Sequence, residues 1–189
     1  MKTLSKAQLW DYFILVARML LGYILFNYGY AKITDGQFGV NEATMNLRLK
    51  DVSLFQVSWY MAGHEPFKSF IGISQITVGA LLIYNRTVIL GAFMAIPIWI
   101  NILMWDMTFM GLYTPFTIRL PFYLLLTFLI LWHYKEKILP AIRNFINGTT
   151  TRFKYPGWAY LLLPVFVALL ELVGAIPSAL VYVFKLLIK

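Results

Sequence analysis

Four apolar segments of this chain each carry one uncharged polar residue able to form hydrogen bonds inside a membrane: Asn27, Gln75, Asn101 and Thr127. At about 1.5 Å per helical residue, all four lie roughly 7 to 12 Å from the same end of their segments. Amides in hydrocarbon are costly unless they are paired or wetted. The layer predicts either interhelical hydrogen bonds or a pocket for a polar head group, with lipid-facing placement as the remaining alternative.

Charged residues mark the same end of three of these segments, at Lys32, Asp106 and Arg119. They either anchor helix ends in the membrane interface or close the polar layer. In the second case Asp106 forms an ion pair with Lys32 or Arg119, and a cationic rim favours an anionic ligand such as a carboxylate or a sulfur oxyanion. The candidate ligand-binding residues are therefore Asn27, Lys32, Gln75, Asn101, Asp106, Arg119 and Thr127.

Further charges lie within apolar segments or at their turns. Arg18 interrupts the first segment, Glu171 lies near the middle of the last one, and Arg86 ends a helical stripe in the second. An ionisable group inside a membrane is a functional hypothesis by default. Either Arg18 and Glu171 form a pair, or Arg18 extends toward water while Glu171 stays protonated. Both interpretations are open.

The composition indicates an integral membrane protein. Of the 189 residues, 60% are hydrophobic, 17% are aromatic and only 13% are charged, whereas soluble domains carry about a quarter charged residues. The net charge of +8 comes mostly from Lys and Arg beside apolar segments, where they anchor helix ends. No basic run is interleaved with exposed aromatic residues, so we expect no nucleic-acid partner; the bilayer itself is the expected partner.

Several kinds of chemistry are not expected. The chain has no cysteine and only two histidines, His64 and His133, which the expected topology places near opposite faces. This disfavours disulfides, thiolate chemistry, a metal site and a haem held by two histidines. No nucleophile elbow, P-loop or dinucleotide-binding glycine pattern occurs. We identify no catalytic residue, no metal site and no covalently bound cofactor.

The apolar segments predict an all-α transmembrane helical bundle in two parts. Residues 1–134 are expected to form a four-helix core with a long outer loop at 32–68, in which the apolar stretch 54–61 is too short to span and lies in the interface or plugs the bundle. Residues 135–189 are expected to form a basic inner loop up to residue 156 and a C-terminal transmembrane helix. The five expected spans are 10–31, 70–84, 88–105, 120–134 and 158–187.

Prolines and the flanking charges refine this topology. Pro97 predicts a kink in the third span, Pro121 is expected near the start of the fourth, and Pro177 leaves open whether the last segment spans once or breaks. The two faces carry nearly equal numbers of Lys and Arg, but the loop after the fourth span is short and densely basic. We therefore expect a cytoplasmic N-terminus.

The chain resembles the DoxX-like family of small bacterial membrane proteins. Residues 18–22 (Arg-Met-Leu-Leu-Gly) and 28–32 (Tyr-Gly-Tyr-Ala-Lys) are similar to that family's opening R-x-x-x-G … G-x-x-K pattern, and residues 75–87 resemble its second helix with an arginine-marked turn. The resemblance covers about residues 10–134 and implies a four-helix bundle linked to redox complexes, including a thiosulfate:quinone oxidoreductase. Many members carry an acid where this chain has Gln75, so a proton-transfer role there is not implied.

These observations favour a membrane subunit associated with a redox or quinone-linked complex and not an enzyme on its own. A quinone and a redox partner subunit are the ligand and partner that this hypothesis implies. The alternatives are a binding or transport protein for a small solute or lipid head group, and a scaffold without catalysis. A homo-oligomer stays open.

Overall fold

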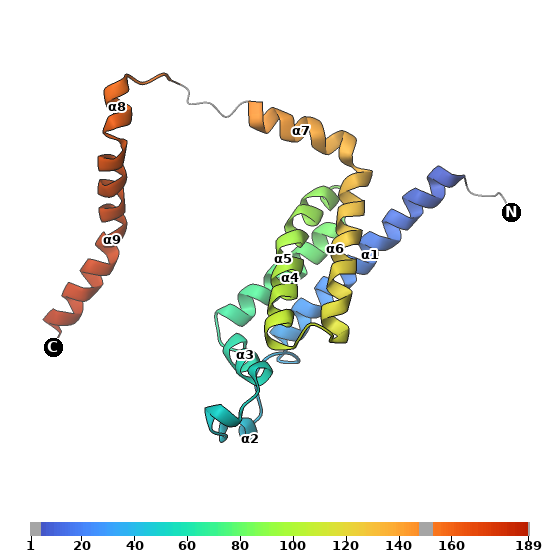
Figure 1. Cartoon of the computed structure of the whole chain (residues 1–189), viewed down its shortest axis with the longest axis horizontal. Coiled ribbons are helices and arrows are strands. Elements are labelled where there is room, and N and C mark those ends of the chain that lie inside the picture. The colour runs from blue at the N-terminus through green and yellow to red at the C-terminus, as the bar shows by residue number, and fades with distance from the viewer. Residues whose placement is uncertain (1–4, 148–152, 189) are drawn as a thin grey trace. The chain divides into compact units, whose positions relative to one another are not determined.

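The computed structural model describes residues 5–147 and 153–188, and this part of the chain contains helices but no strand. The chain divides into two compact units, Met1–Arg143 and Asn144–Lys189, so the first unit extends beyond the expected boundary at residue 134. Four helices pack together in the first unit (Figure 1): α1 (Lys6–Ile33), α4 (Phe67–Ile83), α5 (Val88–Phe109) and α6 (Pro115–His133). The expected all-α bundle with a four-helix core is confirmed.

Local sequence signals set the ends of these helices. Ser5 caps α1 in a reciprocal arrangement with Gln8, and Thr114 accepts a hydrogen bond from the backbone of Thr117 at the start of α6. Pro115 occupies the first turn of α6, so this helix begins five residues before the expected start at Leu120 and Pro121 lies inside it. The Thr114 side chain and Pro115 therefore define the start of α6, which apolar periodicity alone places too late.

The contact between α1 and α4 depends on glycine at four positions, Gly22, Gly29, Gly72 and Gly79. The two helices run antiparallel, because Gly22 lies against Gly79 while Gly29 lies against Gly72. A Cβ atom at Gly79 would lie 2.7 Å from the carbonyl oxygen of Gly22, and one at Gly72 would lie 3.0 Å from that of Gly29. Backbones approach this closely in membranes where small residues line the interface.

A fully buried core fills the centre of the four-helix bundle. Its largest members are Trp99, Ile14, Leu21, Leu25, Leu82, Leu120 and Ile130. Many apolar side chains on the outer faces of the same helices are exposed, among them Tyr12, Val16, Phe93 and Phe128. An apolar exterior of this extent suits lipid and not water.

Residues 34–66, here named the cap, connect α1 to α4. The cap contains α2 (Glu42–Met45), the short helix η1 (Leu49–Asp51) and α3 (Leu54–Ala62). Ser53 and Gln56 form a capping box at the start of α3. The apolar stretch 54–61 is therefore helical, and its helix meets α4 at an angle of 83°, so it does not continue α4 as a straight span.

The region after α6 differs from the expected loop. Residues Lys135–Asn147 form helix α7, and residues 148–152 lie outside the described part of the chain. The apolar positions of α7, at Ile138, Leu139 and Ile142, recur at helical spacing and alternate with Lys137 and Arg143. Such an amphipathic basic sequence is typical of a helix in the membrane interface. These residues were expected to form a loop on the basis of their charge alone.

The second unit contains α8 (Gly157–Leu161) and α9 (Leu163–Leu187). The helical path is interrupted at Leu162, between α8 and α9 and shortly before Pro164. Helix α9 then continues through Pro177 without interruption. The open question about the last segment is thus answered, because Pro177 removes one backbone hydrogen bond from a long helix without ending it. Glu171 is exposed on α9.

Membrane-spanning length is reached by α1, α5, α6 and α9 among the described residues, with a fifth span if the bent pair α3 and α4 is counted. The 17 residues of α4 are short by themselves, yet α4 packs between α1 and α5. The chain is a multi-pass membrane protein.

Replacing Gly79 with Ala is expected to lower the free energy of unfolding by about 1–3 kcal/mol, because the added Cβ overlaps the Gly22 backbone. Thermal unfolding in lipid nanodiscs measures the change. Gly174→Ala is the matched control, since no atom lies within 4 Å of the new Cβ in α9. Equal stability of the two variants would contradict close α1–α4 packing.

Candidate functional site

A cavity of about 1100 Å³ lies at the end of the bundle that the cap covers. Its walls come from the C-terminal end of α1, from α4 up to Val78, from α5 starting at Met94, from the start of α6 and from the cap. It is larger than most pockets for small ligands, which hold roughly 300–1,000 Å³. Polar residues in its wall include Lys32, Gln37, Gln75, Asn101 and Asp106.

Aromatic side chains form much of the remaining wall. They are Tyr28, Phe38, Phe55, Trp59, Phe67, Phe70, Trp105 and Phe116. Phe55 and Trp59 come from α3, so the stretch 54–61, which was expected to lie in the interface or to plug the bundle, contributes to the cavity wall. An apolar and aromatic wall with a few polar groups is the usual composition of a small-molecule site.

Lys32 is held at the cavity by α1 and by the cap. Its side chain is buried, and Nζ donates to the Tyr28 carbonyl at 3.3 Å and to Gln37 Oε1 at 2.8 Å. The same ammonium lies 4.9 Å from the centre of the Phe38 ring. A desolvated cation over an aromatic ring is stabilised by the ring quadrupole, so the cap keeps this lysine in place.

The cap segment that carries Phe38 has an unusual backbone. Phe38 has φ of 72° and Asp35 has φ of 56°, a left-handed region that a bulky side chain rarely adopts. The neighbouring Gly39 donates its N–H to the Trp59 carbonyl at 2.9 Å, and the Phe38 and Trp59 rings meet edge to face. Such strain persists where surrounding contacts determine the conformation, and here it directs Phe38 to the cavity.

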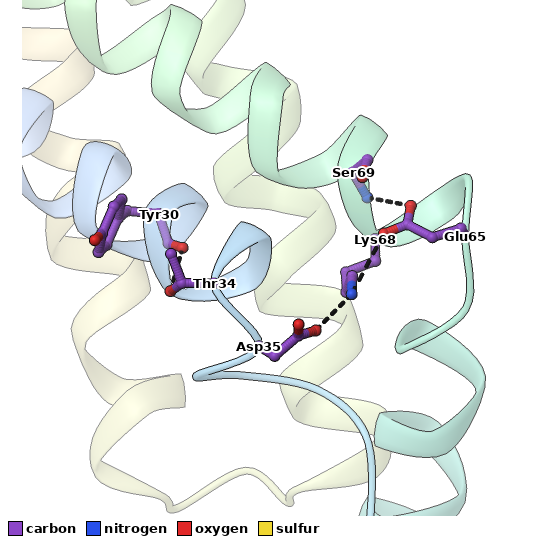
Figure 2. A network of polar contacts seen from close by, with 6 residues as sticks. All are labelled: Tyr30, Thr34, Asp35, Glu65, Lys68 and Ser69. Carbon is purple, nitrogen blue, oxygen red and sulfur yellow. Dashed lines mark hydrogen bonds and ion pairs between the residues drawn. The ribbon is translucent and has the colours of Figure 1, made fainter.

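A polar network joins the cap to α4, as Figure 2 shows. Lys68 Nζ lies 2.5 Å from Asp35 Oδ1 and 3.3 Å from Glu65 Oε1. Glu65 also accepts a hydrogen bond from the Ser69 backbone, and hydrogen bonding from Ser69 lowers the pKa of its carboxyl below the usual 4.5. The Glu65 carboxylate is thereby kept ionised beside Lys68, and one lysine side chain ties the two ends of the cap together.

Asp106 faces the same cavity as Lys32 from α5. Its side chain is buried, with 9% of its surface exposed, and within the described residues it accepts no hydrogen bond and forms no ion pair. It interacts electrostatically with Lys32, but the expected ion pair with Lys32 or Arg119 is absent there. Lys32 is instead held by Gln37 and Tyr28, and Arg119 is exposed on α6.

Gln75 is the most deeply buried polar side chain of the cavity wall. It is 1% exposed, and its Oε1 atom has no hydrogen-bond partner among the residues that the structure describes. The indole N–H of Trp105, also in the wall, is buried and has no partner in this part of the chain either. Buried polar atoms are normally satisfied, so each exception needs an explanation; here two of them border one large cavity.

The predicted polar layer is thus divided. Gln75 and Asn101 line the cavity, whereas Asn27 is exposed on the outer face of α1. Thr127 is fully buried, but its hydroxyl donates to the Tyr123 carbonyl of its own helix at 2.8 Å. None of the four makes an interhelical hydrogen bond within the described residues, so the interpretation as interhelical hydrogen bonding is wrong. Similar depth did not imply a common face.

Two arginines outside the cavity lie at the end of α4 and in the turn that follows it. Arg18 is buried, and it donates to the Leu82 carbonyl at 3.2 Å, to the Ile83 carbonyl at 3.1 Å and to Asn85 Oδ1 at 2.8 Å. The last carbonyls of a helix lack intrahelical partners, and Arg18 supplies them for α4. Arg86 is exposed in the turn that follows. Arg18 therefore does not extend freely to water.

Sequence reasoning missed Phe38, Phe55, Trp59 and Trp105, which line the cavity. Trp105 directly precedes Asp106, and it continues at helical spacing the stripe that Met94, Pro97 and Asn101 form on α5. The cap aromatics carried no such signal, because their position depends on the left-handed backbone at Phe38.

Arg18→Gln is expected to lower the free energy of unfolding by about 2–5 kcal/mol, since the buried α4 carbonyls lose charged donors. Chemical unfolding in mixed micelles checks this. Arg86→Gln, on an exposed arginine of the next turn, should change stability by less than about 0.5 kcal/mol. If Arg18→Gln left the free energy of unfolding unchanged, Arg18 would not stabilise the end of α4.

Lys68→Met is expected to increase backbone hydrogen exchange in residues 35–39 and 59–66, because Asp35 and Glu65 lose their shared partner. Mass spectrometry of deuterium uptake in nanodiscs measures it. Lys50→Met is the control, since Lys50 is exposed on η1 of the same cap. Equal uptake in both variants would mean that the network does not hold the cap.

Comparisons with known proteins place the chain in a family. No family model matches it, and no solved structure gives a significant match. The chain is 32% identical over 129 residues to "Uncharacterized protein YwoB" of Bacillus subtilis (strain 168). The aligned residues make up 67% of this chain and 80% of that relative. Together with the helical membrane bundle described above, this similarity shows that the chain belongs to the family of YwoB.

Proposed function

We propose that this protein binds an amphiphilic molecule in its membrane cavity and acts as the membrane subunit of a redox or quinone-linked complex. The observation that carries the proposal is the cavity of about 1100 Å³, whose wall is mostly apolar and rich in aromatic rings yet includes buried polar atoms, at Gln75 and Trp105, that have no hydrogen-bond partner among the described residues. A polar head with an apolar tail suits such a wall, because each part finds a matching surface.

A quinone is the ligand that we favour. A flat ring can pack against the aromatic side chains of the wall, and Lys32, Trp105 and Asn101 offer N–H donors to ring oxygens. The resemblance of residues 10–134 to DoxX-like proteins supports this choice. Because the chain has no cysteine and we expect no metal site, electrons would come from a partner subunit.

A second candidate is the binding or transport of a small solute or a lipid head group. The opposite charges of Lys32 and Asp106 in one cavity favour this candidate, since a zwitterionic head could pair with both. In either case we propose that the N-terminus is cytoplasmic in a bacterial inner membrane. The cap and the cavity then lie toward the outer face.

Gln75→Leu is expected to reduce bound ligand at least about tenfold without lowering thermal stability, because it removes a buried amide whose Oε1 accepts no hydrogen bond from the described residues. The measurement is solvent extraction of the purified protein followed by mass spectrometry of quinones and lipids. Asn27→Leu, the same change at an exposed amide of α1, should leave the bound amount unchanged. Absence of any enriched amphiphile in the unmodified protein would overturn the proposal.

A further inference from the structure

The hydrogen-bonding groups of the cavity wall are unevenly occupied. Lys32, the cation of the wall, already donates to Tyr28 and Gln37 and lies over the Phe38 ring. The Asp106 carboxylate and Gln75 Oε1 accept nothing within the described residues. What the wall still lacks is therefore mainly hydrogen-bond donors for two buried oxygen groups.

A head group that only accepts hydrogen bonds cannot supply them. A ring carbonyl would accept from the Trp105 indole N–H, which is also unpaired, but would leave Asp106 and Gln75 Oε1 desolvated and unbonded. A buried acceptor without a partner costs about 1–3 kcal/mol, and more if it is charged. A hydroxyl both donates and accepts, so it matches Asp106 or Gln75 on one side and Trp105 on the other.

We infer that the cavity selects a hydroxyl-bearing head group, such as a ring diol, over the corresponding carbonyl compound. This inference rests on the proposed binding function and names the class of ligand more narrowly. Sites built to bond a ligand hydroxyl discriminate strongly against analogues that lack it, because their own polar groups are then left unpaired. For a quinone pair, the reduced diol would be the form that the protein holds.

The test is calorimetric titration of the full chain in nanodiscs, under anaerobic conditions, with a short-tailed benzoquinol and with the benzoquinone bearing the same tail. We expect the quinol to bind at least about tenfold more tightly. Equal or tighter binding of the quinone would overturn the inference while leaving the proposed binding function intact. Binding of neither compound would count against the proposed function itself.

Asp106→Asn separates recognition from damage to the fold. The amide has nearly the same shape as the carboxylate but presents N–H donors, so affinity for the quinol should fall while affinity for the quinone rises. Loss of structure would lower both affinities. Asp51→Asn, at an exposed acid of the cap outside the cavity wall, should keep the original preference. An unchanged quinol-to-quinone ratio in Asp106→Asn would overturn the inference.

Glycerol lipids carry hydroxyl heads too, so a monoacylglycerol is titrated in parallel. Tighter binding of the quinol supports a ring-borne hydroxyl as the source, as the aromatic wall leads us to expect. Tighter binding of the monoacylglycerol would retain the hydroxyl preference and overturn the ring diol as its natural source.

Discussion

The close approach of α1 and α4 across four glycines determines where every other part of the first unit lies. Because the two backbones meet at Gly22 with Gly79 and at Gly29 with Gly72, Arg18, at one end of this contact, reaches the last carbonyls of α4. At the other end, Tyr28 and Lys32 come to the cavity wall beside Gln75. In a bilayer, where water does not drive helices together, such backbone proximity is a main source of association.

Two buried charges border the cavity without pairing with each other. Asp106 and Lys32 border the same space, yet Lys32 is held by Gln37, Tyr28 and the Phe38 ring and forms no ion pair with Asp106. The cap supplies Gln37 and Phe38 through a strained backbone and is itself tied to Lys68. Strain and unsatisfied polar atoms located together at one cavity are typical of a functional site, where a protein retains features that are unfavourable for stability.

Periodicity and composition were sufficient for the bundle, because lipid-facing helices must be long, apolar and internally hydrogen-bonded. They also placed Gln75, Asn101, Lys32 and Asp106 near one end, and these four line the cavity. Depth along a helix does not determine its rotation, so Asn27 and Thr127 were grouped wrongly with them. Periodicity could not place the aromatic residues of the cap, because their position depends on the left-handed backbone at Phe38. It could not place the start of α6 either, because that start depends on the N-terminal hydrogen bond to the Thr114 side chain.

An experimental structure of the protein crystallised from a lipid mesophase, without added ligand, tests the central claim most directly. The account predicts elongated density along the aromatic wall, with its polar end near Gln75, Trp105 and Asp106, and Lys32 still bonded to Gln37. A collapsed cavity, in which Lys32 and Asp106 form a direct ion pair and Gln75 bonds to a neighbouring helix, would contradict it. In that case the polar residues would serve the stability of the bundle and no ligand.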